Sequence, residues 1–281
     1  MAETKKPAET AKKSTAKKAA PAYVPTPEEK SKATGLRIGA VILWIAAFAC
    51  EALAVLTVFK KLFKGLNPTM RIVVMIAFLV ADLIVLIIGS ALWKKSNRLD
   101  PASEKNKAKF WLWNNLGVIA AAFAFIPFII LVLLNKDTDK KTKTIATVVA
   151  VIALLIGGLA SADWNPISAE QKAAAIQYVK GEVYINNGSD IYHLPDCNYI
   201  REGNKLAGEI KTEGVTKYEN VEAAINDGAI RLCKSCLNRH KDELGGHGLL
   251  TSEGVDEKTA DTEALTEAPA TDAEVETDDA E

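Results

Sequence analysis

Residues 36–59 read LRIGAVILWIAAFACEALAVLTVF, an almost unbroken apolar stretch that contains a single acid, Glu51. Three similar stretches follow it, at residues 72–93, 110–134 and 144–162. Each holds about twenty residues, and an α-helix of that length crosses a hydrocarbon core of about 30 Å. Buried helices of soluble proteins are usually shorter and interrupted by charge. The sequence therefore predicts an α-helical membrane protein with four transmembrane helices over residues 36–162, and it excludes an ordinary soluble enzyme.

The charges are segregated along the chain, although the formal net charge is only -1. If the N-terminus lies inside the cell, the inner segments 1–37 and 94–109 hold fifteen basic residues, whereas the outer loops 60–71 and 135–143 hold eight. Because Lys and Arg concentrate on the cytoplasmic side, this bias predicts a multi-pass protein of the inner (plasma) membrane with both termini in the cytoplasm. It also places all five tryptophans near the inner face, as an aromatic belt: Trp44, Trp93, Trp111, Trp113 and Trp164.

Two polar tails enclose these regions. Residues 1–35 are rich in Lys, Ala and Pro, and residues 246–281 are rich in acids, so neither tail buries enough apolar surface to offset its chain entropy. Both are predicted to be disordered. The basic tail either contacts anionic lipid or nucleic acid, or is a solvated segment that helps to set the topology. After the last apolar stretch, Ser168 and Gln171 have the spacing of a capping box, which predicts a short helix within the linker 163–178.

Residues 179–245 have the pattern of a small α+β module. GEVYIN (181–186) and DIYHL (190–194) are rich in β-branched and aromatic residues, and the Asn187-Gly188 pair between them is a strong hairpin signal. Residues 219–227 have helical periodicity, and Gly228 is placed to end that helix. A module of this size has a thin core and usually needs a metal or disulfides for stability.

Three of the four cysteines fall in this module, in the pairs His193-x3-Cys197 and Cys233-x2-Cys236. Two such pairs match a structural zinc site, because a two-residue spacer aims two sulfurs at one ion. Thiolate and imidazole also suit Zn²⁺ better than hard cations. The sequence therefore predicts a zinc-ribbon-like module with structural Zn²⁺. His240 is a rival for the fourth position, and a disulfide is the alternative if the module lies outside the cell.

The string GSDIYHLPDCNYI, followed by VEAAINDGAIRLCKSC, resembles the metal-binding domain at the N-terminus of the Ada DNA-alkylation-repair protein. The resemblance covers residues 181–237 and implies the fold and zinc coordination by Cys197, Cys233 and Cys236. In the Ada-type domain the ligands are four cysteines, and the first also accepts a methyl group. The matching position here is His193, so the resemblance does not imply methyl transfer.

Two acids lie within the apolar stretches, Glu51 in the first and Asp82 in the second. Intramembrane acids are costly, so they indicate either a functional site for a proton or cation, or side chains that hydrogen-bond inside the helical bundle. The sequence contains no phosphate-binding glycine loop, no order of Ser, His and Asp typical of a triad, and no HExxH motif. A role other than catalysis is therefore expected.

The favoured prediction is a membrane protein, in contact with lipid, whose cytosolic zinc module recruits a protein partner and has a binding or regulatory role. Residues 163–250 hold thirteen acids and ten bases, so no excess of basic charge favours nucleic acid, which stays an alternative partner. A second hypothesis is a small oligomeric transporter or channel that uses Asp82 and Glu51. A third is a metal-handling or thiol redox protein. The sequence does not set the oligomeric state.

Overall fold

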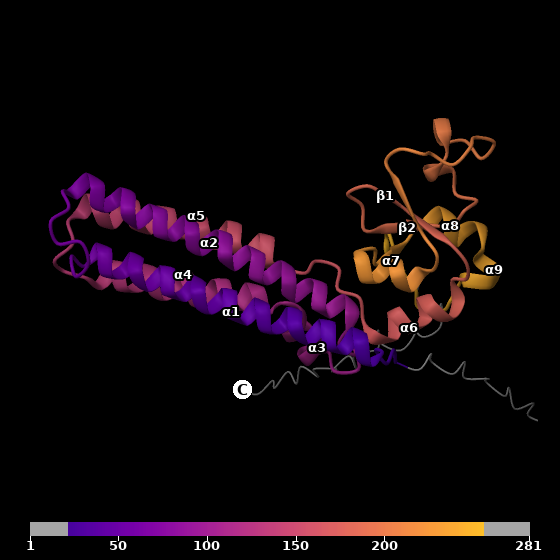
Figure 1. Cartoon of the computed structure of the whole chain (residues 1–281), viewed down its shortest axis with the longest axis horizontal. Coiled ribbons are helices and arrows are strands. Elements are labelled where there is room, and N and C mark those ends of the chain that lie inside the picture. Colours follow the sequence, from indigo (N-terminus) through magenta and orange to yellow (C-terminus); the bar gives the residue numbers. More distant parts are fainter. Residues whose placement is uncertain (1–21, 256–281) are drawn as a thin grey trace, which may run out of the picture.

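A computed structural model describes residues 22–255 of the chain. The tails predicted to be disordered lie outside the described residues over 1–21 and 256–281. The described chain forms an elongated helical bundle with a small mixed module at one end (Figure 1). The two parts contact each other through the ends of the first two long helices.

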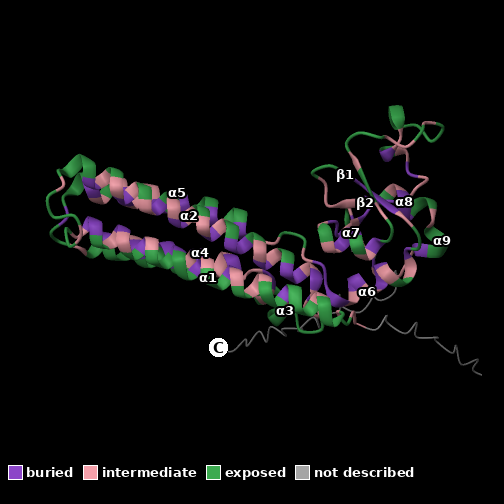
Figure 2. Ribbon diagram, viewed as in Figure 1, coloured by how far each residue is buried: buried purple, intermediate pink, exposed green. Residues whose placement is uncertain are grey.

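Four helices are long and apolar enough to cross a membrane: α1 (Pro27–Val58), α2 (Pro68–Leu99), α4 (Leu116–Leu134) and α5 (Lys140–Ser161). Their outer faces expose large apolar side chains, among them Ile42, Ile84 and Phe123, while small residues such as Ala47 and Ala121 are buried between the helices (Figure 2). A water-soluble bundle buries its large apolar residues instead. Large apolar side chains outside and small ones inside are the arrangement that suits lipid.

The first two helices are longer than the predicted spans. Each has 32 residues and is therefore about 48 Å long, which exceeds a hydrocarbon core of about 30 Å. The prediction of a disordered tail up to residue 35 is wrong over its last part, because α1 already begins at Pro27. Thr26 and Glu29 form a capping box there, and proline at the first helical position is pre-organised for a helix.

The third predicted span is two helices rather than one. The short α3 (Lys107–Asn114) ends at Asn115, and α4 begins at the next residue. The side-chain amides of Asn114 and Asn115 donate to the carbonyl oxygens of Phe110 and Trp111, at 2.9 and 3.0 Å. Asparagine side chains that bond to nearby carbonyls compete with the helical backbone, which gives the break a local cause.

The tryptophans do not form a single exposed belt. Trp111 and Trp164 are exposed, but Trp44 and Trp93 are buried inside the bundle, and Trp113 packs against Trp93. The ring centroids of Trp93 lie 5.5 Å from those of Trp44 and 5.2 Å from those of Trp113. Only Trp111 and Trp164 therefore have the surroundings expected of residues at a membrane interface.

The module begins with the linker helix α6 (Ala169–Tyr178), which has the predicted capping box between Ser168 and Gln171. A six-stranded sheet follows in the order β3-β1-β2-β4-β5-β6. The strands are β1 (Val183–Asn186), β2 (Ile191–His193), β3 (Val215–Tyr218), β4 (Arg231–Leu232), β5 (Leu250–Thr251) and β6 (Gly254–Val255). The short helices are η1 (Asn198–Ile200), η2 (Glu202–Asn204), α7 (Val221–Asp227), α8 (Lys234–Arg239) and α9 (Lys241–Leu244).

The predicted hairpin is present as the antiparallel pair β1–β2, and Gly188 has φ 78°, a value that favours glycine in the turn. Gly228 follows α7 with φ 148° and ends that helix. The predicted acidic tail starts too early at residue 246, because Leu249 is fully buried and β5 and β6 complete the sheet. The burial of Leu249 explains why the chain stays in the fold to this point.

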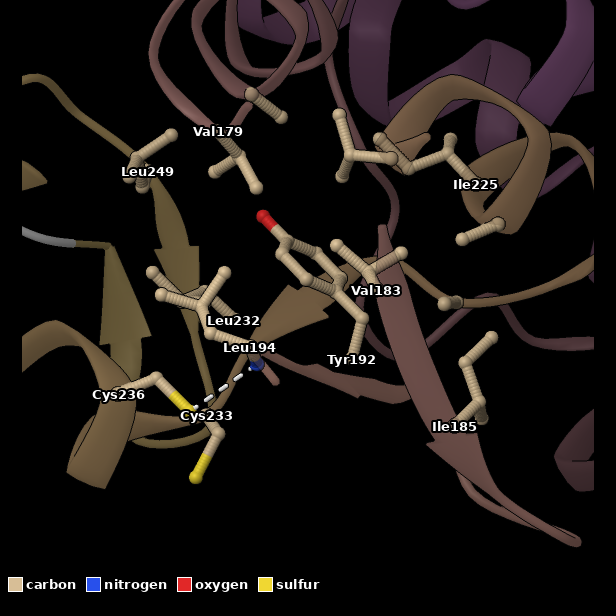
Figure 3. Packing of buried hydrophobic residues seen from close by; sticks show 14 of the residues in the cluster. Val179, Val183, Ile185, Tyr192, Leu194, Ile225, Leu232, Cys233, Cys236 and Leu249 are labelled. Atoms are coloured by element: carbon tan, nitrogen blue, oxygen red, sulfur yellow. Dashed lines mark hydrogen bonds between the residues drawn. The ribbon is translucent and has the colours of Figure 1, made fainter. Parts of the chain in front are cut away.

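The module has its own apolar core around Tyr192, which is 1% exposed and lies among Val179, Val183, Leu232 and Leu249 (Figure 3). The core includes the three cysteines of the module. The sheet and α7 therefore fix where the sulfur atoms lie.

A buried lysine joins the module to the bundle. Lys172 on α6 is fully buried, and its Nζ donates to the carbonyl oxygens of Arg98 and Leu99, at 2.9 and 3.2 Å, and to Asn226 Oδ1 at 2.8 Å. It also lies 3.9 Å from the ring centroid of Tyr23. Burial lowers the pKa of Lys172 to about 8. Three acceptors satisfy this ammonium group, so the contact between α2, α6 and α7 is specific.

Candidate metal centre

Four side chains of the module converge on one point, and each comes from a defined element. His193 is the last residue of β2, and Cys197 follows in a turn closed by a hydrogen bond from its N–H to the Leu194 oxygen, at 3.0 Å. Cys233 follows β4 directly, and Cys236 lies on the first turn of α8. Each pair is thus local in the chain.

The parallel pairing of β2 with β4 brings the two pairs together. Tyr192 lies opposite Leu232 in this pairing, and the Cys233 N–H donates to the Tyr192 oxygen at 3.0 Å. His193 and Cys233, which follow the paired residues Tyr192 and Leu232, therefore lie side by side. The spacing in the sequence does not specify that the two ligand pairs meet; the pairing of β2 with β4 brings them together.

The distances suit one small ion. The ligand atoms of His193, Cys197, Cys233 and Cys236 all lie within 4.8 Å of one another. His193 Nδ1 is 3.3 Å from Cys197 Sγ, and Cys197 Sγ is 4.0 Å from Cys233 Sγ. Tetrahedral zinc with Zn–S bonds of about 2.3 Å requires sulfur atoms about 3.8 Å apart, and a nitrogen about 3.6 Å from each sulfur. This cluster of four residues could therefore hold a metal ion.

All four residues are buried, with exposed fractions between 0 and 5%. Burial by itself would lower the pKa of His193, but hydrogen bonds with the sulfurs of Cys197 and Cys233 outweigh it and raise that pKa to about 9. Hydrogen bonds from the neighbouring sulfurs lower the pKa of the Cys233 thiol. Close-packed thiols and an imidazole without another role in the fold are the donor set of a metal centre.

Two further groups support the ligands and were not predicted from the sequence. The Leu194 N–H donates to Cys236 Sγ at 3.4 Å, a contact that favours the thiolate form of the sulfur (Figure 3). His193 Nε2 lies 3.3 Å from the side-chain amide of Asn186. The Asn186 atom in this contact is the amide nitrogen Nδ2. If Nδ1 binds metal, Nε2 carries the hydrogen, and the Asn186 amide would have to turn over so that its oxygen accepts this hydrogen and orients the ring. Asn186 is the last residue of β1, beside the hairpin turn. This position in the sequence is the signal by which Asn186 could have been predicted to support His193.

The other histidines lie elsewhere. His240, the rival ligand, has Nε2 2.9 Å from Asp196 Oδ2 and is not a member of the cluster. His247 stacks on Tyr178, with 3.7 Å between the ring centroids. His193 is thus the histidine that the fold places beside the three sulfurs.

One side of the cluster borders a hollow of about 700 Å³. His193 and Cys233 line its floor, and Lys211, Lys234 and the half-exposed Tyr199 line its rim. If the cluster holds an ion, a small chelator would reach it from this side. No open coordination position is needed for substrate, however, because four protein ligands complete a tetrahedron.

The two acids of the apolar stretches lie on neighbouring helices, Glu51 on α1 and Asp82 on α2. Asp82 is fully buried on α2, and Glu51 on α1 is 8% exposed. The two carboxyl groups are close enough to interact electrostatically. Neither oxygen of Asp82 has a hydrogen-bond partner among the described residues. The polar side chains of Ser90, Asn114 and Asn115, which were possible partners for Asp82 inside the bundle, donate instead to backbone carbonyl oxygens four residues earlier.

Comparison with known proteins gives no relative. No protein-family model, curated protein or solved structure matches the chain. The likeness to the Ada-type domain therefore stays a prediction, and the functional argument rests on the geometry of this chain.

Proposed function

We propose that this chain is an integral membrane protein of four spans, with a cytosolic module that Zn²⁺ holds in shape and that binds a protein partner. The single observation that carries the proposal is the buried cluster of His193, Cys197, Cys233 and Cys236 with near-tetrahedral spacing. The class of protein is thus a membrane-anchored binding or regulatory module.

Zinc is the ion that this donor set favours. Three sulfurs and one imidazole nitrogen suit Zn²⁺ better than Ca²⁺ or Mg²⁺, which prefer oxygen. A tetrahedron completed by four protein ligands leaves no place for a reactive water, so the role is structural. Burial of all three sulfurs also argues against a thiol redox enzyme, whose reactive cysteine must be accessible.

The membrane and its sidedness follow from two arguments. Large apolar side chains on the outer faces of α1, α2, α4 and α5 support insertion into lipid. The fifteen basic residues of the inner segments against eight in the outer loops support a cytosolic module. A reducing compartment keeps thiols free to bind metal, in agreement with that orientation.

The surface that we assign to a partner is the long loop between Cys197 and β3. Leu206 is 58% exposed and Tyr199 is 49% exposed, and they are the most exposed large hydrophobic side chains between residues 165 and 254. Arg201 organises the loop, because its guanidinium donates to the carbonyl oxygens of Gly208 and Pro195 at 2.7 and 2.8 Å. Exposed aromatic and aliphatic residues held on an ordered loop are typical of a protein-binding surface. The metal fixes Cys197, from which this loop starts.

The metal is tested on the full-length protein, purified in detergent without chelator. Elemental analysis should find one zinc per chain, and Cys233→Ser should lose it. His240→Ala is the matched control and should keep it. Wild-type protein that contains no zinc by elemental analysis would contradict the proposal.

The partner surface is tested by cross-linking in intact cells. A photo-reactive amino acid at position 206 should give defined adducts with the partner. The same amino acid at position 180, an exposed position that precedes the candidate ligands in the sequence, should give none. The adducts should disappear when Cys233→Ser is combined with the cross-linker. Adducts that persist in the metal-free protein would show that the metal is not required for partner binding. An adduct with nucleic acid alone would favour nucleic acid as the partner.

A second candidate function is proton or cation movement through the bundle, alone or as an oligomer. The observation that favours it is the fully buried carboxyl group of Asp82, without a hydrogen-bond partner among the described residues and close to Glu51. Proteoliposomes that hold a pH-sensitive dye would show flux, and Asp82→Asn, which keeps the shape of the side chain, should abolish it. Equal flux in wild type, variant and empty vesicles would exclude this function.

A further inference from the structure

A second hollow, of about 420 Å³, lies where the module meets the end of α2. Arg98, in the last turn of α2, forms one wall. The β1–β2 turn, including Asn187, and the end of α7 at Asp227 form the others. This hollow is polar and contains none of the four candidate metal ligands, although Asn186, which contacts His193, lines one edge of it.

Arg98 is the unusual member of this wall. Its guanidinium is half-buried and forms no hydrogen bond or ion pair with a side chain or backbone group in residues 22–255. Asp163, behind it, attracts it electrostatically without forming an ion pair within 4 Å. Gly228 lets the group approach the backbone, because a Cβ there would lie 3.4 Å from Arg98 Nη1. An arginine that presents free N–H groups to a hollow is suited to bind an oxyanion.

The depth of the hollow relative to the membrane narrows the choice of ligand. The apolar stretch of α2 ends at Trp93, and Arg98 follows five residues later, about 7.5 Å further along the helix. The headgroup layer on each side of the hydrocarbon core is about 5–8 Å thick. The short helix α3, which carries the exposed Trp111, lies at the same end of the bundle as the module (Figure 1). Arg98 therefore lies at the level of lipid phosphates.

The hollow also holds carboxylates, which rules out a simple anion site. Asp190 is paired with Arg231 at 2.5 Å. Asp227 accepts a hydrogen bond from the Tyr218 hydroxyl through one oxygen, which leaves its second oxygen available. Within residues 22–255, the guanidinium of Arg98 has no hydrogen bond and the carboxylate of Asp227 has one bonded oxygen, and both groups line this hollow. Together they match a ligand that carries both a phosphate and an ammonium group.

We propose that this hollow binds the headgroup of a zwitterionic phospholipid of the phosphoethanolamine class. Arg98 would bind the phosphate, and Asp227 would accept hydrogen bonds from the primary ammonium group. The inference rests on the membrane insertion proposed above and on a folded module, but it does not depend on which side of the membrane the module faces. It assigns the module a lipid ligand in addition to a protein partner.

The test uses full-length protein that has been delipidated in detergent and checked for zinc content. Phosphatidylethanolamine, phosphatidylcholine and phosphatidylglycerol with identical acyl chains are added, and bound lipid is counted by native mass spectrometry. Wild type should retain phosphatidylethanolamine best. The methylated ammonium of phosphatidylcholine has no N–H to donate, and phosphatidylglycerol has no ammonium group.

Arg98→Gln should weaken retention of phosphatidylethanolamine about tenfold, the loss expected for hydrogen bonds to a charged group. Lys95→Gln, an exposed lysine of the same helical region outside the hollow, is the matched control and should behave as wild type. Asp227→Asn should remove the preference for phosphatidylethanolamine over phosphatidylglycerol. Since Arg98 forms no hydrogen bond or ion pair within residues 22–255, its replacement should leave the lipid-free protein folded and lower its melting temperature only slightly, through the lost attraction to Asp163.

Equal retention of phosphatidylethanolamine by wild type and Arg98→Gln would overturn the proposal. Equal losses of bound lipid in Arg98→Gln and Lys95→Gln would also overturn it, because only the general basic charge would then matter. A further arm adds glycerophosphoethanolamine and inorganic phosphate. If either competes as well as the lipid, the ligand is a soluble phosphate compound and not a lipid. Failure of the protein to enter vesicles at all would instead contradict the proposed membrane insertion.

Discussion

Replacement of Cys236 by serine should unfold the module and leave the helical bundle intact. Cys236 is fully buried, its sulfur accepts a hydrogen bond from the Leu194 N–H, and it is one of the four candidate ligands. A structural zinc contributes about 10 kcal/mol or more at neutral pH. A folded region the size of residues 169–255 has a total stability of about 9 kcal/mol, at about 0.1 kcal/mol per residue. The binding free energy of the metal is therefore about as large as the total free energy of unfolding of the module. Loss of one ligand should be enough to unfold the module.

The assay is hydrogen exchange of the full-length protein, read by mass spectrometry, together with the zinc content of the same sample. In Cys236→Ser, amides of β1, β2 and α7 should exchange with the fast kinetics of an unfolded chain, while α4 and α5 keep their protection. His240→Ala is the control, because this side chain is partly exposed and contacts Asp196 rather than the cluster. Wild-type protection in a metal-free Cys236→Ser protein would refute the reasoning, because the core would then hold the module without the ion.

Three other changes test separate contacts. Burial lowers the pKa of Lys172 from 10.5 to about 8, so between these values the unfolded chain binds a proton that the folded protein does not, and stability should rise with pH by up to about 3 kcal/mol. Lys172→Met should lack this rise in thermal melts at pH 7.5 and 9.5; the same slope in both proteins would show that another group titrates. Gly89→Ala should destabilise the bundle by about 1–3 kcal/mol, because the new Cβ would lie 2.9 Å from the ring of Trp44. Gly158→Ala, with nothing within 4 Å, should not destabilise it, and equal melting temperatures would contradict the packing argument. Arg201→Ala removes two charge-assisted hydrogen bonds and should speed amide exchange in residues 198–211 while zinc stays bound; unchanged exchange there would mean that the loop is ordered by other contacts.

The helices could be predicted because each depends on its own residues. Long apolar runs specify helices that face lipid, and the hairpin turn at Asn187-Gly188 and the capping box at Ser168 are local signals. The start of α1 at Pro27 also had a local signal, a capping box at Thr26, but the polar composition around it favoured a tail. Composition is a poor guide where a helix continues beyond the membrane, since its surroundings there are aqueous.

The candidate site was predictable only in part. Residue type and spacing point to the three cysteines, but the choice between His193 and His240 depends on the parallel pairing of β2 with β4. That pairing joins segments about forty residues apart, and no local pattern in the sequence specifies it. The role of Asn186 depends on the same sheet. The strands after residue 249 were missed because two-residue strands have no detectable periodicity.

The metal and the junction with the bundle depend on the same short segment of chain. α7 carries Glu222 and Asn226 and ends six residues before Cys233. Glu222 accepts a hydrogen bond from the Tyr23 hydroxyl at 2.7 Å, and Asn226 contacts both Lys172 and, at 2.8 Å, Glu29 of α1. When Cys233 is fixed at the metal, β4 is fixed, and α7 is placed where these polar groups meet the bundle. Loss of the metal would release α7 and leave Lys172 buried without Asn226, which is costly for an ammonium group. A metal ion bound by this cluster would therefore affect the ends of α1 and α2, and an isolated module could not report that effect.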